Sequence, residues 1–208
     1  MAVTLYGIGA SPYVRGARLG LEEKRVDYNF VDMPMGSHKE AAHLARHPFG
    51  RVPAFAHDGF ALYETQAILR YVDQVFPGEP LQPAGARAQA RMNQLMGIVD
   101  WYVMPSMSAL AFQRLIVPRL GGISDEAVIA KALPTARIAI AEIDRLADGQ
   151  PYLTGERVSL ADLMLAPHYY YFSLTPEGKS LGGDYPGLVG WLARMATHAS
   201  MKATAPQL

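Results

Sequence analysis

The segment from residue 77 to residue 85 divides the chain into two parts with different periodicity. It holds three prolines and two glycines, which is typical of a linker and not of a helix or strand. Before it, apolar and polar residues alternate in several short runs, as in β-strands. After it, apolar residues recur at helical spacing, and we find no convincing strand. The sequence therefore predicts a small α/β domain at residues 1–77, a linker at 78–87 and an all-helical domain at 88–208.

The first part is expected to fold in the order strand, helix, strand, helix, strand, strand, helix. These elements are residues 3–6, 13–24, 26–30, 38–46, 52–55, 60–62 and a helix that begins near Glu64. Asp58-Gly59 lies between two short apolar runs, which is a strong signal for a tight hairpin turn. The order of these elements resembles that of a thioredoxin-like domain.

Four longer helices are expected in the second part. They lie at Met92 to Val103, Val128 to Leu146, Leu160 to Phe172 and Leu188 to Ala196. Ser159 and Asp162 form a capping box at the start of the third of these helices, where two side chains satisfy free backbone N–H groups. No apolar stretch approaches the roughly 18 residues of a membrane span. The first twenty residues lack the features of a signal peptide, so we expect a cytoplasmic protein that does not bind membranes.

Composition excludes several kinds of chemistry. Lysine plus arginine equals aspartate plus glutamate, 19 each, so no general attraction to nucleic acid or to an anionic membrane is expected. The chain has no cysteine, which excludes disulfides, zinc–thiolate sites and a cysteine nucleophile. Any thiol chemistry must therefore use a thiol that a substrate brings. His43 and His47 lie four residues apart but outside an HExxH motif, so we expect no metal site.

Ser11 and Thr65 each stand at the expected start of a helix. A hydroxyl there caps the helix, or it binds an anion together with the positive end of the helix dipole. Beside a bound thiol, Ser11 would donate a hydrogen bond to the thiolate. The positive potential would lower the thiol pKa from about 8.5. For both residues the plain helix cap is the competing interpretation.

Arg51-Val52-Pro53 comes just before the expected hairpin. A proline is tolerated at the opening of such a strand, but not inside a central one. If the Val52–Pro53 bond is cis, the Val52 backbone groups turn outward and can pair with an extended peptide. The alternative is an ordinary trans proline. His38-Lys39 lies in a loop, where both side chains either meet a carboxylate or remain solvated.

Several segments together resemble a glutathione transferase. In the first part they are Ala10-Ser11-Pro12, Gly36-Ser37-His38-Lys39, Pro48 to Phe55 and Leu62 to Ile68; in the second part they are Gln113 to Gly121 and Leu153 to Asp162. The likeness covers nearly the whole chain and is closest to the phi class and similar bacterial enzymes. It implies the glutathione transferase fold, an α/β thioredoxin-like N-terminal domain followed by an all-α C-terminal domain.

The resemblance also implies roles for individual residues. Ser11 matches the catalytic serine of the family. The glutathione-binding positions fall on His38, Lys39, Arg51, Val52, Pro53, Glu64 and Thr65. Of these, His38 and Lys39 match the residues that meet the glycyl carboxylate. The Val52 backbone matches the partner of the cysteinyl unit, Pro53 matches the cis-proline, and Glu64 with Thr65 matches the pair that holds the γ-glutamyl group.

Two departures from the family pattern are visible. The family usually has serine after the glutamate, and Thr65 keeps the hydroxyl but adds a methyl group. The residue before Pro48 is often asparagine in the family, and here it is His47. Neither change removes a needed hydrogen-bond donor.

The implied activity is conjugation of glutathione, as co-substrate, to small hydrophobic electrophiles in detoxification. The electrophile pocket would be lined by Pro12, Tyr13, Tyr102, Met107 and Tyr169. The implied assembly is a homodimer in which Phe49 inserts into the partner subunit. A glutathione-dependent peroxidase, isomerase or dehalogenase, and a non-catalytic glutathione carrier, are the alternatives. Tyr6 is a rival to Ser11, because some classes use a tyrosine near the first strand.

Overall fold

The computed structural model describes residues 2–206, which form two compact units. The N-terminal unit comprises residues 2–82 together with 197–206, and the helical unit comprises 83–196. The tail from residue 197 therefore packs with the N-terminal unit, whereas the sequence analysis assigned all of 88–208 to the helical domain.

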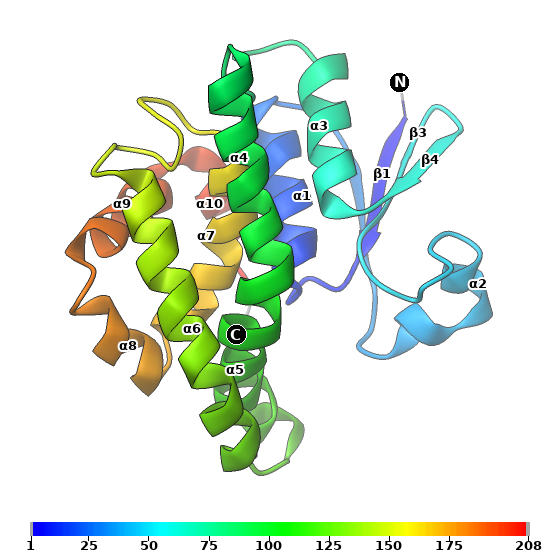
Figure 1. Cartoon of the computed structure of the whole chain (residues 1–208). Helices are drawn as coiled ribbons and strands as arrows, with labels where there is room; N and C mark the ends of the chain where they lie inside the picture. Colours follow the sequence, from blue (N-terminus) through cyan, green and yellow to red (C-terminus); the bar gives the residue numbers. More distant parts are fainter. Residues whose placement is uncertain (1, 207–208) are drawn as a thin grey trace. The chain divides into compact units, whose positions relative to one another are not determined.

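A four-stranded mixed sheet forms the centre of the N-terminal unit (Figure 1). Its strands are β1 (Val3–Gly7), β2 (Asn29–Asp32), β3 (Ala54–His57) and β4 (Phe60–Tyr63), in the spatial order β2-β1-β3-β4. β1 runs parallel to β2 and antiparallel to β3, and β3 and β4 form the expected hairpin. Asp58 and Gly59 both have positive φ, at 47° and 87°, as a type I′ turn requires. The thioredoxin-like arrangement is confirmed.

The helices of the N-terminal unit surround this sheet. They are α1 (Pro12–Glu23), η1 (Ser37–Lys39), α2 (Ala41–Leu44), α3 (Thr65–Val75) and α10 (Ala199–Ala203). α1 and α3 lie together on one face of the sheet, and α2 lies beyond the other (Figure 1). Leu5, Val14, Phe55 and Ile68 meet in the apolar core between the sheet and the helices α1 and α3.

Buried polar contacts attach the tail to α1. The Arg15 side chain is only 3% exposed. Its guanidinium donates to the Met201 carbonyl oxygen at 3.1 Å and to Thr204 Oγ1 at 3.4 Å. A buried guanidinium must be hydrogen-bonded to be tolerated. These bonds therefore explain why the tail belongs to the N-terminal unit.

The helical unit contains helices of very different length. They are α4 (Ala86–Ile98), η2 (Val99–Ser108), α5 (Ala109–Ala111), η3 (Phe112–Ile116), η4 (Pro118–Leu120), α6 (Glu126–Ala147), α7 (Leu160–Ser173), α8 (Pro176–Gly182) and α9 (Pro186–Thr197). Along α7, apolar residues are buried on nearly every side, as expected of a central helix. Within residues 83–196 of the described chain no strand is formed, apart from one isolated bridge between Tyr152 and Gly155.

Residues 86–116 form one continuous helical run of 31 residues, in which η2 and η3 are π-helical. By length and composition this run is apolar enough to cross a membrane, since one window of it has a mean hydropathy of 1.3. The expectation that no stretch qualifies was therefore wrong. Polar residues such as Asp100 interrupt the run of apolar residues, but the mean hydropathy of the window remains high enough for a membrane span. Half of that window is buried inside the protein, and core helices pass the same test.

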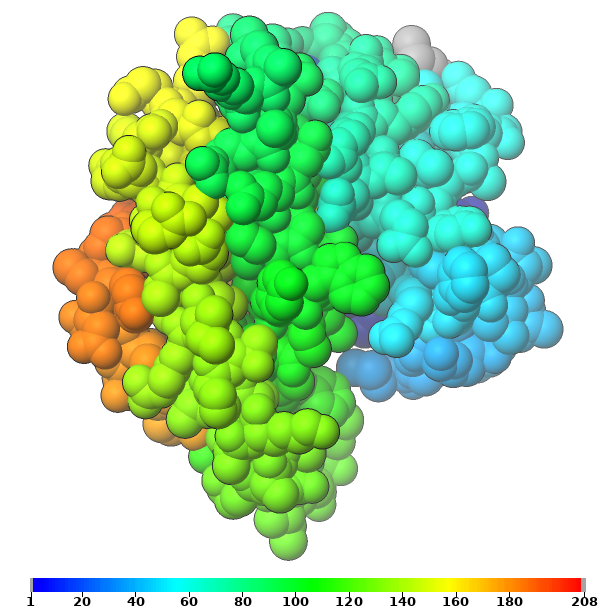
Figure 2. Space-filling view, in the orientation of Figure 1, coloured from blue at the N-terminus to red at the C-terminus, as the bar shows by residue number. Residues whose placement is uncertain are grey.

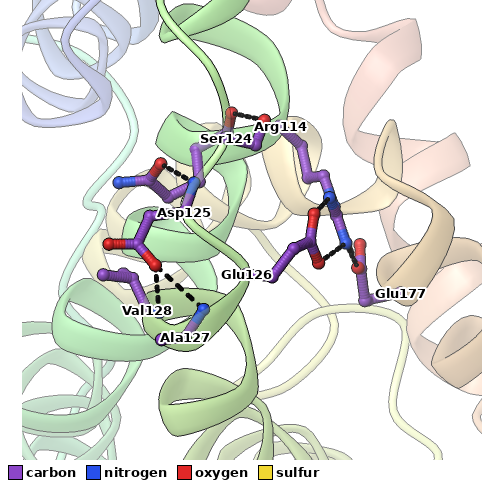
Figure 3. A network of polar contacts seen from close by, with 8 residues as sticks. Arg114, Ser124, Asp125, Glu126, Ala127, Val128 and Glu177 are labelled. Carbon is purple, nitrogen blue, oxygen red and sulfur yellow. Dashed lines mark hydrogen bonds and ion pairs between the residues drawn. The ribbon is translucent and has the colours of Figure 1, made fainter.

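An arginine network closes the turn that follows this helical run (Figure 3). Arg114 on η3 bonds to Glu126 at the start of α6 and to Glu177 on α8, with Nη2–Oε2 and Nε–Oε1 distances of 3.0 and 2.9 Å. These ion pairs raise the pKa of Arg114 above its ordinary value. Ser124 Oγ donates to the Gln113 carbonyl oxygen at 2.7 Å and ties the same turn to η3.

Asp162 at the start of α7 is completely buried and accepts four hydrogen bonds. Two come from the backbone N–H and hydroxyl of Ser159, at 2.8 and 2.7 Å, so the expected capping box is confirmed. The others come from the Leu153 N–H at 2.9 Å and from Trp191 Nε1 at 2.7 Å. Burial raises the pKa of this carboxyl, and the four hydrogen bonds oppose the shift.

Candidate functional site

Ser11 occupies the N-cap of α1, at the end of a tight turn after β1. The turn is held by the Ser11 N–H, which donates to the Ile8 carbonyl oxygen at 2.8 Å, and by the Gly9 N–H, which donates to Asp32 Oδ1 at 2.9 Å. Ser11 Oγ accepts a long hydrogen bond, 3.4 Å, from the Val14 N–H. A hydroxyl has one donor and two acceptor sites. Capping therefore leaves its proton available, and the two interpretations of Ser11 are compatible.

Glu64 and Thr65 stand at the start of α3 in different roles. Glu64 is the N-cap, but its side chain makes no capping bond, and its backbone has φ 72° and ψ 115°. Positive φ is unfavourable for a residue with a side chain, and such strain is concentrated at functional sites. Thr65 is buried, and its Oγ1 donates to the Tyr13 carbonyl oxygen at 3.3 Å. Thr65 is thus not a simple cap, because its hydroxyl joins the start of α3 to the start of α1.

The segment before β3 offers a free stretch of backbone. The Val52–Pro53 peptide bond is cis. Pro53 is buried and Val52 is half-buried. Within residues 2–206, neither the N–H nor the C=O of Val52 makes a hydrogen bond. Both groups are available to an extended peptide, as the sequence analysis proposed.

Two side chains from the preceding segment hold the loop that leads to Val52. Lys39 Nζ donates to the Gly50 carbonyl oxygen at 2.9 Å, and His43 Nε2 donates to the Arg51 carbonyl oxygen at 2.7 Å. The Lys39 ammonium has three donor hydrogens, so this bond does not exhaust it. The Arg51 side chain is exposed, and His38 is half-buried, with an Nδ1 atom that has no hydrogen-bond partner in the described chain.

A ladder of rings extends from His43 to the exposed Phe49. His43 stacks on His47 with ring centroids 6.2 Å apart, and His47 stacks on Tyr63 at 4.6 Å. The Phe49 ring meets His47 and Tyr63 edge-on, each at 6.2 Å, and remains 68% exposed. Burial lowers the pKa of His47, and the positive charges of His43, Arg51 and Lys39 lower it further. Burial and the charges of Lys39, His43 and Arg51 likewise lower the pKa of His38.

The sequence did not reveal that His43 holds the Arg51 carbonyl oxygen and stacks on His47. The spacing of four between His43 and His47 was considered only as a metal pattern, although it also places two rings on one side of a helical turn. Within the described residues, no group of three or more histidine, aspartate or glutamate side chains is placed to hold a metal ion.

The five residues expected to line the electrophile pocket are divided between the units. Pro12 and Tyr13 are half-buried at the start of α1, and Tyr102 on η2 is 55% exposed. Met107 and Tyr169 are buried within the helical unit and present no open surface to a ligand. The Tyr169 ring packs against Phe172 and Trp191, and burial raises its pKa to about 12. The pocket therefore stays a prediction.

Tyr6, the rival to Ser11, lies inside β1. It pairs with Val31 and Ala54 on the neighbouring strands, and the Arg46 guanidinium lies 4.3 Å from its ring centroid. This cation–π contact gives Tyr6 a structural role.

Comparisons with known proteins cover both units. The family model described as glutathione S-transferase, N-terminal domain, matches residues 5–80, and that of the C-terminal domain matches residues 126–194. The chain is 32% identical to glutathione S-transferase 3 of Zea mays over 205 residues, which cover 96% of this chain and 91% of that relative. It is also 32% identical to a glutathione S-transferase of Hyoscyamus muticus, over 93% of this chain and 92% of that relative.

Solved structures agree with this assignment. Glutathione S-transferase III in its apo form is 30% identical, with a TM-score of 0.88 over 100% of this chain and 98% of that chain. Glutathione S-transferase I from maize, in complex with an atrazine glutathione conjugate, is 27% identical, with a TM-score of 0.85 over 99% and 97% of the two chains. The chain therefore belongs to the glutathione S-transferase family, beside plant relatives of the phi class.

Proposed function

We propose that this glutathione S-transferase conjugates glutathione to small hydrophobic electrophiles, and that Ser11 stabilises the reactive thiolate. The observation that supports this most directly is the hydrogen bond from Thr65 Oγ1 to the Tyr13 carbonyl oxygen. It brings the start of α3, with Glu64 and Thr65, beside the start of α1, with Ser11. Two helix starts then offer positive potential to one anionic ligand.

Glutathione would lie along the N-terminal unit. The free N–H and C=O of Val52 would pair with its cysteinyl backbone, next to the buried Pro53. Glu64 and Thr65 would hold the γ-glutamyl group. The glycyl carboxylate would meet His38, Lys39 and Arg51, which gather in the loop region around η1 and before β3.

Ser11 would act as a hydrogen-bond donor and not as a base. Its hydroxyl proton is not used in capping, so it can point at the glutathione sulfur. A hydrogen bond to a charged group contributes roughly 1.5–3 kcal/mol, and one pKa unit corresponds to about 1.4 kcal/mol. The thiol pKa would therefore fall by one to two units, with a further contribution from the helix start. The thiol proton leaves to solvent or to a carboxylate of glutathione, and the sulfur then forms a bond to an electrophilic carbon. With an aryl halide the halide ion leaves; with an activated double bond the π electrons move to the neighbouring carbon, which takes a proton from solvent.

The test is Ser11→Ala. We expect kcat to fall about tenfold or more, because the thiolate loses a charged hydrogen bond. The KM for glutathione should change little, since the backbone and carboxylate contacts remain. The apparent pKa in the pH profile of kcat/KM should rise by about one unit or more. Tyr6→Phe is the matched control and should keep the wild-type profile. Full activity and an unchanged pH profile in Ser11→Ala would leave Ser11 as a helix cap only.

The electrophile class is also part of this proposal. The maize relative named above was solved with an atrazine glutathione conjugate, and another 27% identical structure holds lactoylglutathione. A panel of aryl halides, enals and organic hydroperoxides would separate conjugation from peroxidase activity. A non-catalytic carrier would bind glutathione without producing thiolate absorbance. A cytoplasmic role in detoxification and a homodimer complete the proposal.

A further inference from the structure

The helical unit has a surface pocket of about 540 Å³, which lies between the start of α4, the end of α6 and the segment that follows α6. Three arginines line it, two from the first turns of α4 (Arg87 and Arg91) and one from the last turn of α6 (Arg145). Figure 2 shows the green start of α4 beside the yellow segment that follows α6. None of the residues of the candidate glutathione site lines this pocket.

The positive charge in the pocket is only partly balanced. Asp148 is the one carboxylate among the lining residues, against three guanidinium groups. In the described chain, Arg87 makes no ion pair or hydrogen bond. Arg91 bonds to the neutral Gln94 at 2.8 Å. The hydrogen bond from Arg145 lowers the pKa of the Glu142 carboxyl, and the charges of Arg145 and Arg91 lower it further. Arg145 pairs with Glu142 outside the pocket, through two bonds of 2.7 Å. That pair is exposed, and exposed ion pairs contribute little, so a ligand can compete for it.

The grouping leaves an excess of positive charge, because two carboxylates, Asp148 and Glu142, lie near three guanidinium groups. Arg87 and Arg91 are four residues apart on one helix face, where like charges repel each other. The whole chain has equal numbers of acidic and basic residues, so the excess here is local. An anion bound between the guanidinium groups would remove the repulsion.

The pocket's shape and lining define the kind of anion. Guanidinium groups bind carboxylates and phosphates through paired hydrogen bonds, and a phosphate has more acceptor oxygens for three of them. Ala88, which is half-buried, and the small exposed part of Leu146 supply apolar surface, and Gln150 and Thr154 supply neutral hydrogen-bonding groups. The volume suits a small organic molecule and exceeds what a bare ion needs.

We propose that this pocket binds a small phosphate monoester, with its dianionic phosphate between Arg87, Arg91 and Arg145 and its organic part over Ala88 and Leu146. The site is independent of glutathione conjugation. Phenyl phosphate is the probe, and inorganic phosphate is the comparison that isolates the contribution of the apolar surface.

Binding is measured by isothermal titration calorimetry at low salt, with saturating glutathione present throughout. We expect saturable binding of phenyl phosphate, weaker binding of inorganic phosphate, and a loss of at least about tenfold in affinity in the Arg87→Gln/Arg91→Gln double variant. Arg137→Gln removes an exposed positive charge from α6 outside the pocket and is the matched control. Transferase activity should be unchanged in all three proteins.

Three outcomes would overturn the proposal. The first is the absence of saturable binding by wild-type protein. The second is an equal loss of affinity in Arg137→Gln, which would show attraction to general surface charge. The third is equal affinity for phenyl phosphate and inorganic phosphate, which would show that the organic part of the ligand makes no favourable contact in the pocket. None of these results bears on Ser11 or on glutathione, so failure here is distinguishable from failure of the proposed conjugation.

Discussion

At the scale of residues, His43 connects α2 to the loop that carries the glutathione-binding backbone. Its Nε2 donates to the Arg51 carbonyl oxygen, one residue before Val52, and its ring stacks on His47. The position of Val52 therefore depends on a buried imidazole that does not itself belong to the candidate site.

We expect His43→Phe to raise the KM for glutathione about fivefold while changing kcat less. Phenylalanine keeps the stacked ring, but it leaves the Arg51 carbonyl oxygen without its donor, a loss of about 1 kcal/mol. Steady-state kinetics with varied glutathione gives both constants, and thermal melting checks that the variant is folded. His47→Asn, which restores the common family residue, is the control and should keep the wild-type KM. An unchanged KM in His43→Phe would show that the loop holds its position without this bond.

Single residues also show what the sequence can and cannot predict about the site. Ser11 was identifiable from the sequence, because a hydroxyl side chain just before a helix has few roles. It caps the helix, or it donates a hydrogen bond to a bound anion. The partner of Thr65 was not identifiable, since Tyr13 lies 52 residues away and is brought near only by the packing of α3 on α1. His43 gave no signal of its role, because its acceptor is a backbone oxygen, which every residue has.

At the scale of elements, two helices of the helical unit carry an aspartate at their N-terminal end, Asp125 as the N-cap of α6 and Asp162 in the first turn of α7, in very different surroundings. Asp125 at the start of α6 is exposed and accepts from the N–H groups of Ala127 and Val128, at 2.9 and 3.2 Å. Asp162 at the start of α7 is fully buried and also holds Trp191 and the Leu153 backbone.

Replacing each aspartate by alanine should therefore have unequal effects on stability. We expect Asp162→Ala to lower the free energy of unfolding by about 3–5 kcal/mol, because several buried donors lose their acceptor at once. Asp125→Ala should cost about 1 kcal/mol, the usual contribution of an exposed cap. Urea unfolding followed by circular dichroism measures both. If both variants lost the same free energy of unfolding, water would have taken the place of the Asp162 carboxylate as the hydrogen-bond acceptor in the buried site.

The elements that the sequence predicted well are those with many repeats of one period. The 22 residues of α6 show six turns of apolar spacing, so its ends were placed within two residues. α8 and α10 have seven and five residues, too few to show a period, and they were missed. β2 begins at Asn29 and not at Val26, because the alternation of side chains continues beyond the residues that pair with β1.

At the scale of the whole molecule, the exposed ring of Phe49 is relevant to assembly. The Phe49 side chain is 68% exposed, and its ring meets those of His47 and Tyr63 edge-on; in the proposed dimer it would enter a pocket of the other subunit. In a two-fold dimer, one such residue makes the contact twice.

We expect Phe49→Ala to shift the protein from dimer to monomer at micromolar concentration. Sedimentation velocity over a dilution series measures this shift. Phe60→Ala is the control, since Phe60 is also exposed, at 49%, on the same unit, and its loss should leave the dimer intact. Wild-type protein that sediments as a monomer would refute the dimer itself.

The attachment of the tail to α1 has a consequence for synthesis. Arg15 is translated long before its partners Met201 and Thr204, which follow it by 186 and 189 residues. Domains generally fold in the order in which they are made. In this chain the buried guanidinium has to wait until all of residues 83–196 have been translated. The N-terminal unit thus cannot complete its own buried polar contacts before the whole helical unit has been made.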